Sequence, residues 1–316
     1  MKLKVAIQGI EGCNHYIAAL EYFGNLPVET VSCGTFRELA ERVAHDPGTA
    51  AVMAIENTIA GSLLPNYRLV RENDLEIIGE YKLRISHALA ALPGTALGDI
   101  REVNSHPMAL MQCAEYLDTL PGVKVVEKED TAASAKWIRD NRLTGHAAVC
   151  PACAAEIYGL DVLAEGIETN KRNFTRFLVL ANRSASARLR REIAAAAKEP
   201  AKEPANGLAS GLASGPASRP AGGPAAGTAL PQVNKSSLVF TLPHSSGSLS
   251  RVLSVLSFYD MNLSMIQSLP ILGKEWEYQF YINLLFPDYR RYRQAVDAIV
   301  PLTGEFKILG EYAEHR

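Results

Sequence analysis

The sequence of 316 residues lacks an excess of charge of either sign, since 32 lysines and arginines stand against 34 aspartates and glutamates. Proteins that bind nucleic acid or anionic membrane surfaces usually carry a basic patch, so we expect neither partner. A run of about 18 apolar residues is also missing, which argues against a transmembrane helix. The apolar run after Met1 stops at Ile7 and is too short for the core of a signal peptide.

Cysteine is too sparse for a disulfide framework, because five cysteines, an odd number, are spread over the chain. We therefore predict a cytoplasmic protein. Cys150-Pro-Ala-Cys153 resembles a redox motif, but no second ligand pair follows at zinc-finger spacing. The turn Gly9-x-x-Gly12 lacks the third glycine of a nucleotide fingerprint. We expect no metal and no cofactor.

Aromatic residues and valine are absent from residues 191–231, where alanine, glycine, proline and serine dominate. Such a segment cannot bury enough apolar area to offset the entropy lost on ordering. It divides the chain into a first domain over residues 1–184, a flexible linker over residues 185–235 and a second domain over residues 236–316. The start of the linker, "ARLRREIAAAAKE", is rich in residues that favour helix.

Short apolar runs alternate with helical patterns through the first domain, which predicts an α/β fold with parallel strands and crossover helices. One helical pattern, "NHYIAALEYFG", ends at Gly24, and another begins at Thr35, which forms a capping box with Glu38. The expected strands are "KVAIQ", "AAVMAIE", "LEIIGEY", "SHALAAL", "EVNS", "HAAVC" and "TRFLVLA".

The second domain has a different pattern of strands and helices. Strand-like "SSLVFTLP" precedes an amphipathic helix in "GSLSRVLSVLSFYD", two strands follow in "NLSMIQSLPI" and "WEYQFYINLLF", and "YRRYRQAVDAIVPLT" and "FKILGEY" read as a helix and a last strand. This order, β-α-β-β-α-β, is that of the ferredoxin-like unit. We expect four antiparallel strands.

Several motifs of the first domain occur together and in one order: "VAIQGIEGCNHYIAA", "AIENTIAGS", "NSHPMALMQC", "DTAASA" and "NFTRF". In these motifs the chain resembles the prephenate dehydratase family with a C-terminal ACT regulatory domain, and the resemblance covers nearly all of the chain outside the linker. It implies two α/β lobes like those of periplasmic binding proteins, with the substrate in the cleft between them. It also implies the cofactor-free conversion of prephenate to phenylpyruvate.

That reaction removes a ring hydroxyl as water and a carboxylate as carbon dioxide. By resemblance, Thr175 is expected to hydrogen-bond the departing hydroxyl and Arg176 to bind a substrate carboxylate through its two-pronged guanidinium. These are the predicted catalytic residues. The further substrate contacts are expected in the matching motifs and at strand-to-helix turns, whose free N–H groups hold anions: Glu56, Asn57, Thr58, Ser105, His106, Asn173 and Phe177.

Structural roles remain alternatives for several of these positions. Thr58 and Ser105 could serve as helix N-caps, and His106 could be a structural histidine rather than an acid or base. Phe177 would most simply pack in the core beneath its strand.

The second domain is expected to bind phenylalanine as a feedback inhibitor, as the resemblance implies. The predicted effector site is formed by Gly247, Ser248 and Leu249, at the start of a helix, and by Gln267, Ser268, Leu269 and Pro270. Because a slack linker transmits no strain, coupling to the first domain must run through contacts between the domains. A homodimer or homotetramer through paired ACT domains is expected.

Two alternative functions remain open. The first is an arogenate dehydratase, which uses the same residues on the transaminated substrate, and the second is a non-catalytic amino acid sensor of binding-protein type. No helical domain like that of chorismate mutase precedes the first strand, so we expect a monofunctional chain.

Overall fold

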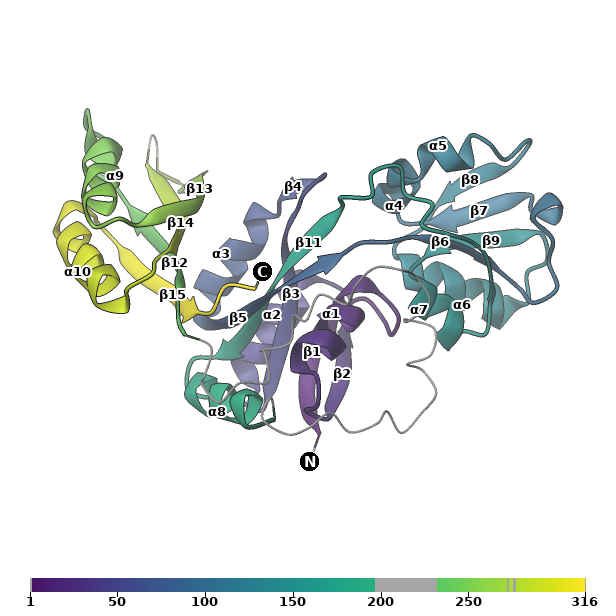
Figure 1. The fold of residues 1–316 in the computed structure, drawn as a ribbon, viewed down its shortest axis with the longest axis horizontal. Helices are drawn as coiled ribbons and strands as arrows, with labels where there is room; N and C mark the ends of the chain where they lie inside the picture. Colours follow the sequence, from purple (N-terminus) through teal and green to yellow (C-terminus); the bar gives the residue numbers. More distant parts are fainter. Residues whose placement is uncertain (1, 197–231, 272, 275–276, 316) are drawn as a thin grey trace.

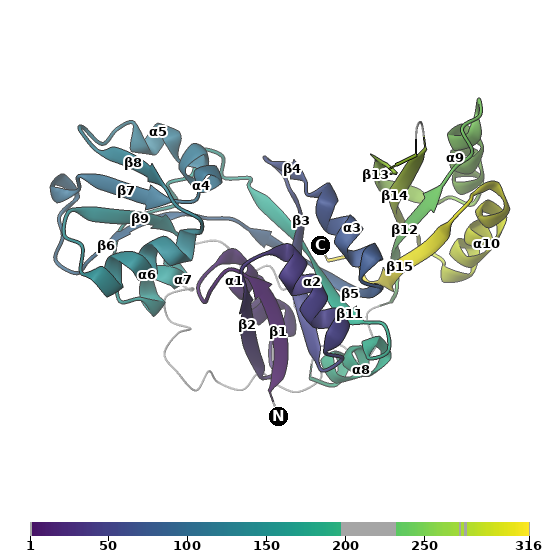
Figure 2. The same cartoon turned by 180° about the vertical axis from the view of Figure 1, so that it is seen from behind.

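The computed structural model describes residues 2–196, 232–271, 273–274 and 277–315. Figure 1 shows three sheets in a row, each covered by helices, and Figure 2 shows the same arrangement from behind. The predicted α/β class and the ferredoxin-like second domain are both confirmed. Among the described residues, no helix is long and apolar enough to cross a membrane.

The first lobe is built on a sheet with the strand order β2-β1-β3-β11-β5, and β4 pairs with β3 at one end. Its strands are β1 (Leu3–Gln8), β2 (Val28–Cys33), β3 (Thr49–Asn57), β4 (Gly61–Ser62), β5 (Leu75–Arg84) and β11 (Phe174–Asn182). Its helices are α1 (Asn14–Phe23), α2 (Phe36–His45), α3 (Leu64–Glu72) and α8 (Ser186–Ala196).

The second lobe is built on a sheet with the strand order β10-β6-β9-β7-β8. Its strands are β6 (Ala88–Ala91), β7 (Glu102–Ser105), β8 (Lys124–Glu127), β9 (His146–Cys150) and β10 (Asp161–Glu165). Its helices are α4 (Pro107–Gln112), α5 (Ala114–Leu117), α6 (Thr131–Asn141) and α7 (Ala152–Ile157), with a 3₁₀ turn at Leu97–Asp99. The chain passes between the lobes twice, from β5 to β6 and from β10 to β11 (Figure 1).

The expectation of purely parallel sheets was wrong. β1 pairs in parallel with β2 and β3, but β11 runs antiparallel to both β3 and β5. In the second lobe, β6 is antiparallel to β9 and β10. The reason is the second crossing, because the chain returns from the second lobe and enters the first sheet in the reverse direction.

The C-terminal domain contains β12 (Lys235–Thr241), α9 (Ser248–Phe258), β13 (Asn262–Pro270), β14 (Tyr278–Leu285), α10 (Tyr289–Ile299), a 3₁₀ turn at Val300–Leu302 and β15 (Phe306–Tyr312). Its strands are antiparallel in the order β13-β14-β12-β15. Both helices cover one face of this sheet (Figure 1). The opposite face packs its apolar side chains on the first lobe, including Val239, Tyr281 and Leu309.

Part of the predicted linker is folded. Helix α8 lies on the first lobe, where Leu189 is fully buried and Arg190 donates to Glu76 Oε1 at 3.0 Å. Ile193 of the same helix also packs against the core of the first lobe. Residues 197–231 of the predicted linker lie outside the described residues, and its last residue, Lys235, is already the first residue of β12.

The C-terminal domain and the first lobe approach each other closely along β15 and β5. A Cβ atom added to Gly310 would lie 2.2 Å from the carbonyl oxygen of Ile77, so only glycine permits this approach. Lys307 Nζ also lies 2.6 Å from Asp74 Oδ1 across the same contact. The domains are thus joined by direct packing, as the expected coupling between them requires.

Candidate active site

The side chains of β11 alternate between two faces of the first sheet, as those of any strand do. Thr175 and Phe177 point to one face and Arg176 to the other. Phe177 is buried and its ring meets that of His15 edge-on at 5.0 Å between centroids. Phe177 therefore packs in the core beneath its strand, which was the simplest expectation from the sequence.

Thr175 is almost completely buried, with 9% of its surface exposed, and its hydroxyl oxygen accepts a hydrogen bond of 3.0 Å from Asn57 Nδ2. Asn57 is the last residue of β3 and lies directly opposite Thr175 in the strand pairing. Within the described parts of the chain no group accepts the hydroxyl hydrogen of Thr175, so this hydrogen can be donated to a substrate.

Asn57 is fixed at both ends of its amide. Its Oδ1 atom accepts from the backbone N–H groups of Ile59 and Ala60 at 2.9 and 2.8 Å. Its Nδ2 atom also donates to Asn173 Oδ1 at 2.7 Å. The turn after β3 therefore sets the orientation of the amide that holds Thr175.

The network extends into the second lobe through Gln112, a residue that the sequence reasoning missed. Asn173 Nδ2 donates to Gln112 Oε1 at 2.9 Å, and His87 Nε2 lies 3.1 Å from the same oxygen. Since an amide oxygen only accepts, His87 must donate from Nε2. The "HPMALMQC" motif contained the signal, because Gln112 is the polar residue of an otherwise apolar helix face.

His87 and Glu168 complete the buried end of this network. Burial lowers the pKa of His87, so the ring is neutral near pH 7. Its backbone N–H donates to Glu168 Oε2 at 2.9 Å, and Glu168 is only 1% exposed. Arg84 and Lys171, both exposed, lie 4.0 and 3.9 Å from the other oxygen of this carboxylate.

Thr58 and Ser105 use their hydroxyl groups within the protein. Thr58 is exposed, and its oxygen accepts from the N–H of Phe174 at 3.0 Å and donates to the carbonyl of Arg172 at 3.2 Å. Ser105 is fully buried and donates to the carbonyl of Val149 at 2.6 Å. The hydroxyl hydrogen of Ser105 is thus used within the second lobe, and its expected contact with substrate stays a prediction.

His106 caps helix α4. Its Nδ1 atom accepts from the N–H of Met108 at 3.2 Å, while the ring is otherwise exposed. The capping role that was open for Ser105 thus belongs to His106, and the exposed ring leaves acid or base work open.

The turn after β1 lies against the second lobe. Tyr158 donates from its hydroxyl to the carbonyl of Glu11 at 2.9 Å, and a Cβ on Gly9 would meet Cys13 Sγ and Asp130 Oδ2 at 3.1 and 3.2 Å. Burial raises the pKa of the Asp130 carboxyl, which caps α6 by accepting from the N–H of Ala133 at 2.7 Å.

The cysteines of the Cys-x-x-Cys sequence are not activated. Burial raises the pKa of Cys150 to about 12 and that of Cys153 to about 11, so both are neutral thiols near pH 7. All five cysteines of the chain are free. Among the described residues there is no group of three or more histidines, cysteines, aspartates or glutamates arranged to hold a metal ion.

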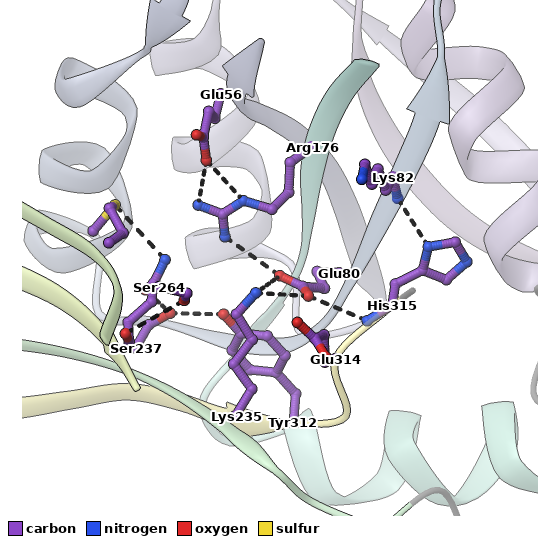
Figure 3. A network of polar contacts seen from close by, with 12 residues as sticks. Glu56, Glu80, Lys82, Arg176, Lys235, Ser237, Ser264, Tyr312, Glu314 and His315 are labelled. Atoms are coloured by element: carbon purple, nitrogen blue, oxygen red, sulfur yellow. Dashed lines mark hydrogen bonds and ion pairs between the residues drawn. The ribbon is translucent and has the colours of Figure 1, made fainter. Parts of the chain in front are cut away.

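Arg176 does not join this cluster. On the opposite face, its Nε and Nη2 atoms donate to Glu56 Oε2 at 3.1 and 3.0 Å, and its Nη1 atom donates to Glu80 Oε2 at 3.3 Å (Figure 3). The structure thus separates the predicted pair Thr175 and Arg176, and it likewise places Glu56 away from Asn57. Alternation along β11 and β3 is the cause, because neighbouring strand residues point to opposite faces.

The fold and this site define a protein with two α/β lobes, which carry a hydroxyl held by amides at their junction, and a ferredoxin-like domain after them. The model of the prephenate dehydratase family matches residues 5–185 of this chain, and the chain belongs to that family. The sequence-based recognition is therefore confirmed.

Individual relatives show similarity along most of the chain. Arogenate dehydratase 2 of Petunia hybrida is 34% identical over 85% of this chain, which spans 57% of that relative's length. Among solved structures, prephenate dehydratase of Arthrobacter aurescens in complex with L-Phe has a TM-score of 0.73 and 25% identity, covering 98% of this chain and 90% of that one. A structure described as a novel type of quorum quenching acylase has a TM-score of 0.76 and 25% identity, covering 98% of both chains.

Proposed function

We propose that the protein is a prephenate dehydratase, which converts prephenate to phenylpyruvate in the formation of phenylalanine. The observation that carries the proposal is the Thr175 hydroxyl, whose oxygen accepts from Asn57 while its hydrogen remains free. In this orientation the hydroxyl can donate to the oxygen that departs from the substrate ring. A fixed donor in a water-poor site stabilises developing charge more than the same donor in water does.

The reaction needs no electron acceptor. The bond to the departing carboxylate breaks and its electron pair enters the ring, while the ring C–O bond breaks and the hydroxyl leaves as water after taking a proton. Thr175 stabilises the leaving oxygen, and the Asn57–Asn173–Gln112 chain keeps Thr175 in place. We also propose that the exposed cations Arg84 and Lys171 attract the dianionic substrate.

Formation of phenylpyruvate from prephenate by the purified protein tests this function. We expect turnover by the natural sequence and loss of turnover in Thr175→Ala with the fold retained. An inactive natural protein that binds an amino acid without turnover would instead support the sensor.

Arogenate is the second candidate substrate, because the similar Petunia protein is an arogenate dehydratase. Arogenate carries an amino group where prephenate has a keto group, far from the leaving hydroxyl, so the same Thr175 chemistry serves both. The ratio of kcat/KM for the two substrates decides between them. Equal or higher kcat/KM for arogenate would replace our assignment.

An acylase, as named for one similar structure, is not favoured by the site. A threonine nucleophile needs a neighbouring base, and within the described parts of the chain the hydroxyl of Thr175 is hydrogen-bonded to an amide, not to an imidazole or carboxylate. The thiols near the junction are equally unsuited, since burial raises the pKa of Cys13 to about 12.

We further propose that phenylalanine binds to the C-terminal domain as a feedback inhibitor. Strands β12 and β13 both run antiparallel to β14, so the turn at Gly247 and the end of β13 at Pro270 lie at the same end of the sheet. Gly247 adopts a φ of 79° and is the N-cap of α9, whose first N–H groups suit a carboxylate. Calorimetry with phenylalanine, together with the activity at saturating phenylalanine, tests the proposal; no heat and unchanged activity would contradict it.

The assembly proposed is a homodimer or homotetramer formed through C-terminal domains. Apolar side chains exposed on this domain support it, since Phe258 is 77% and Ile266 39% exposed. Light scattering after size-exclusion chromatography measures the assembly directly.

We place the protein in the cytoplasm, where its five free cysteines remain reduced.

A further inference from the structure

The guanidinium of Arg176 is enclosed by groups from several elements. Besides Glu56 of β3 and Glu80 of β5, the hydroxyl of Tyr67 on α3 accepts from Nη2 at 2.9 Å. Only 14% of the Arg176 side chain is exposed. Burial alone would lower its pKa, but Tyr67, Tyr312, Glu80 and Glu56 together hold this pKa above the ordinary value of arginine.

The C-terminal domain contributes Asn283 and Lys235 to the surroundings of the Arg176 guanidinium. With the Asn283 amide oriented to satisfy both of its ends, its oxygen accepts from Arg176 Nη1 at 3.3 Å and from Nη2 at 3.2 Å. Lys235, the first residue of β12, donates from Nζ to both oxygens of Glu80 at 2.8 and 2.9 Å (Figure 3). Both Lys235 and Glu80 are buried, with side chains 6% and 2% exposed.

This arrangement balances two cations against two carboxylates. If Lys235 were removed, Glu80 would become a buried carboxylate with Arg176 as its remaining cation, and the Arg176 side chain would be drawn away from Glu56. Buried charges tolerate the loss of one partner poorly. The C-terminal domain therefore takes part in setting where the Arg176 side chain lies.

The pairing of β11 with β3 places the Arg176 ion pair next to Thr175, on the opposite face of the sheet. Arg176 is paired with Glu56 and Thr175 with Asn57, so two consecutive residues of each strand make two cross-strand bonds on opposite faces. The pairing register shifts between Arg176 and Phe177 and then continues from Phe177 to Ala181, so Thr175 and Arg176 are separated from the rest of the ladder by this irregularity. The Arg176–Glu56 ion pair thus joins the two strands between this irregularity and Thr175, and the backbone hydrogen bond from the N–H of Thr58 to the carbonyl of Phe174 joins them on the other side of Thr175.

We infer that Arg176 is a positioning residue for Thr175, acting through Glu56, and that the C-terminal domain holds it in place through Lys235 and Asn283. The inference rests on the proposed role of Thr175 in the reaction. It replaces the expectation that Arg176 binds a substrate carboxylate. Displacement of a reacting group by about 1 Å can lower a rate by roughly a hundredfold.

Substitution of the ion pair separates positioning from substrate binding. Arg176→Lys and Glu56→Gln are expected to lower kcat about tenfold or more, with KM changed by less than about threefold. In a Thr175→Ala background the same substitutions should have little further effect on kcat, because they act through the missing hydroxyl. A rise in KM with unchanged kcat, or full additivity with Thr175→Ala, would overturn the inference.

The contribution of the C-terminal domain is tested with two lysine substitutions. Lys235→Met is expected to lower kcat several-fold, whereas Lys307→Met removes an ion pair across the same domain contact, to Asp74, and should leave kcat within about twofold. Equal effects of the two substitutions would overturn the role of the C-terminal domain. Thermal unfolding of each variant confirms that it is folded.

A structural readout keeps the inference independent of the reaction. In a crystal structure of Glu56→Gln, the distance from Asn57 Nδ2 to Thr175 Oγ1 should exceed its present 3.0 Å by several tenths of an ångström, beyond hydrogen-bond range. An unchanged distance with the Arg176–Glu56 bonds lost would refute the positioning role even if the natural protein turned over neither prephenate nor arogenate.

Discussion

At the residue scale, the polarity of one hydrogen bond gives Thr175 its proposed task. Asn57 Nδ2 donates to the hydroxyl oxygen of Thr175, so the hydroxyl hydrogen can be donated to a substrate. Thr175→Ala should lower kcat by about 10² to 10³, the cost of removing one preorganised donor, with little change in KM. Steady-state assays of phenylpyruvate formation measure this.

Two control variants refine that prediction. Thr175→Ser keeps the hydroxyl and should retain most of the activity, while Thr175→Val keeps the shape without the hydroxyl and should resemble Thr175→Ala. An active Thr175→Val variant would remove the donor role.

The buried ring of His15 makes stability depend on pH. Burial lowers its pKa from 6.5 to about 3, and its Nε2 atom accepts from the N–H of Ala54 at 3.2 Å. Below pH 6.5 the unfolded chain binds a proton at this residue and the folded chain does not, so stability falls with decreasing pH. The slope is about 1.4 kcal/mol per pH unit between the two values.

His15→Asn should therefore reduce this slope by about 1.4 kcal/mol per pH unit, as measured by urea unfolding between pH 4.5 and pH 6. His87 contributes in the same direction, so part of the slope persists. The exposed residue His45 provides the control substitution, His45→Asn. Parallel curves for His15→Asn and the natural protein would contradict the account.

Sequence reasoning predicted Thr175, Asn57 and Asn173 as site residues because they lie in motifs with a fixed order, and the structure brings the three into one hydrogen-bond network. It failed for Gln112 and for the direction of Arg176. Gln112 meets Asn173 only through folding, since 61 residues separate them. The partners of Arg176 come from β3, β5, α3 and the C-terminal domain, and no local pattern shows that they enclose one side chain.

At the scale of single elements, the cap of α2 was readable from the sequence. Thr35 accepts from the N–H of Glu38 at 3.1 Å, and Glu38 Oε2 accepts from the N–H of Gly34 at 2.8 Å. The reciprocal bond thus reaches one residue further back than in the usual capping box.

Thr35→Ala should lower the free energy of unfolding by about 1 kcal/mol, because one N–H at the start of the helix loses its partner. Thr35→Ser keeps the acceptor and should cost only a few tenths of a kcal/mol. Urea unfolding at pH 7 distinguishes them, and equal stabilities of the two variants would show that the cap is not used.

The strands that sequence reasoning found are those with a buried apolar run, such as β3 and β11. Those it missed are polar or partly exposed: β2 reads "VETVSC", β8 "KVVE" and β10 "DVLAE". They lie at sheet edges, where one side of the ladder has no neighbour and apolar residues are not required. Their sequences therefore contain little signal.

At the scale of the whole molecule, the contact between the domains depends on Gly310. Gly310→Ala should force β15 from β5, because the added Cβ would lie 2.2 Å from the carbonyl oxygen of Ile77. We expect the thermal transition of this variant to be broader than that of the natural protein, or split, as the C-terminal domain separates. Differential scanning calorimetry measures this, and Gly98→Ala, where a Cβ meets nothing within 4 Å, is the control. Identical transitions for both variants would contradict it.

The same contact also protects a strand. β5 ends the first sheet, and its outer edge would otherwise present unpaired backbone groups. The N–H of Lys82 instead donates to His315 Nδ1 at 3.2 Å, and the carbonyls of Ile77 and Ile78 accept from Arg190 at 3.0 and 3.2 Å. An uncovered strand edge recruits strands from other molecules. The C-terminal domain and α8 therefore protect the edge of β5 from aggregation. A first domain expressed without them should be poorly soluble even where its own core is intact.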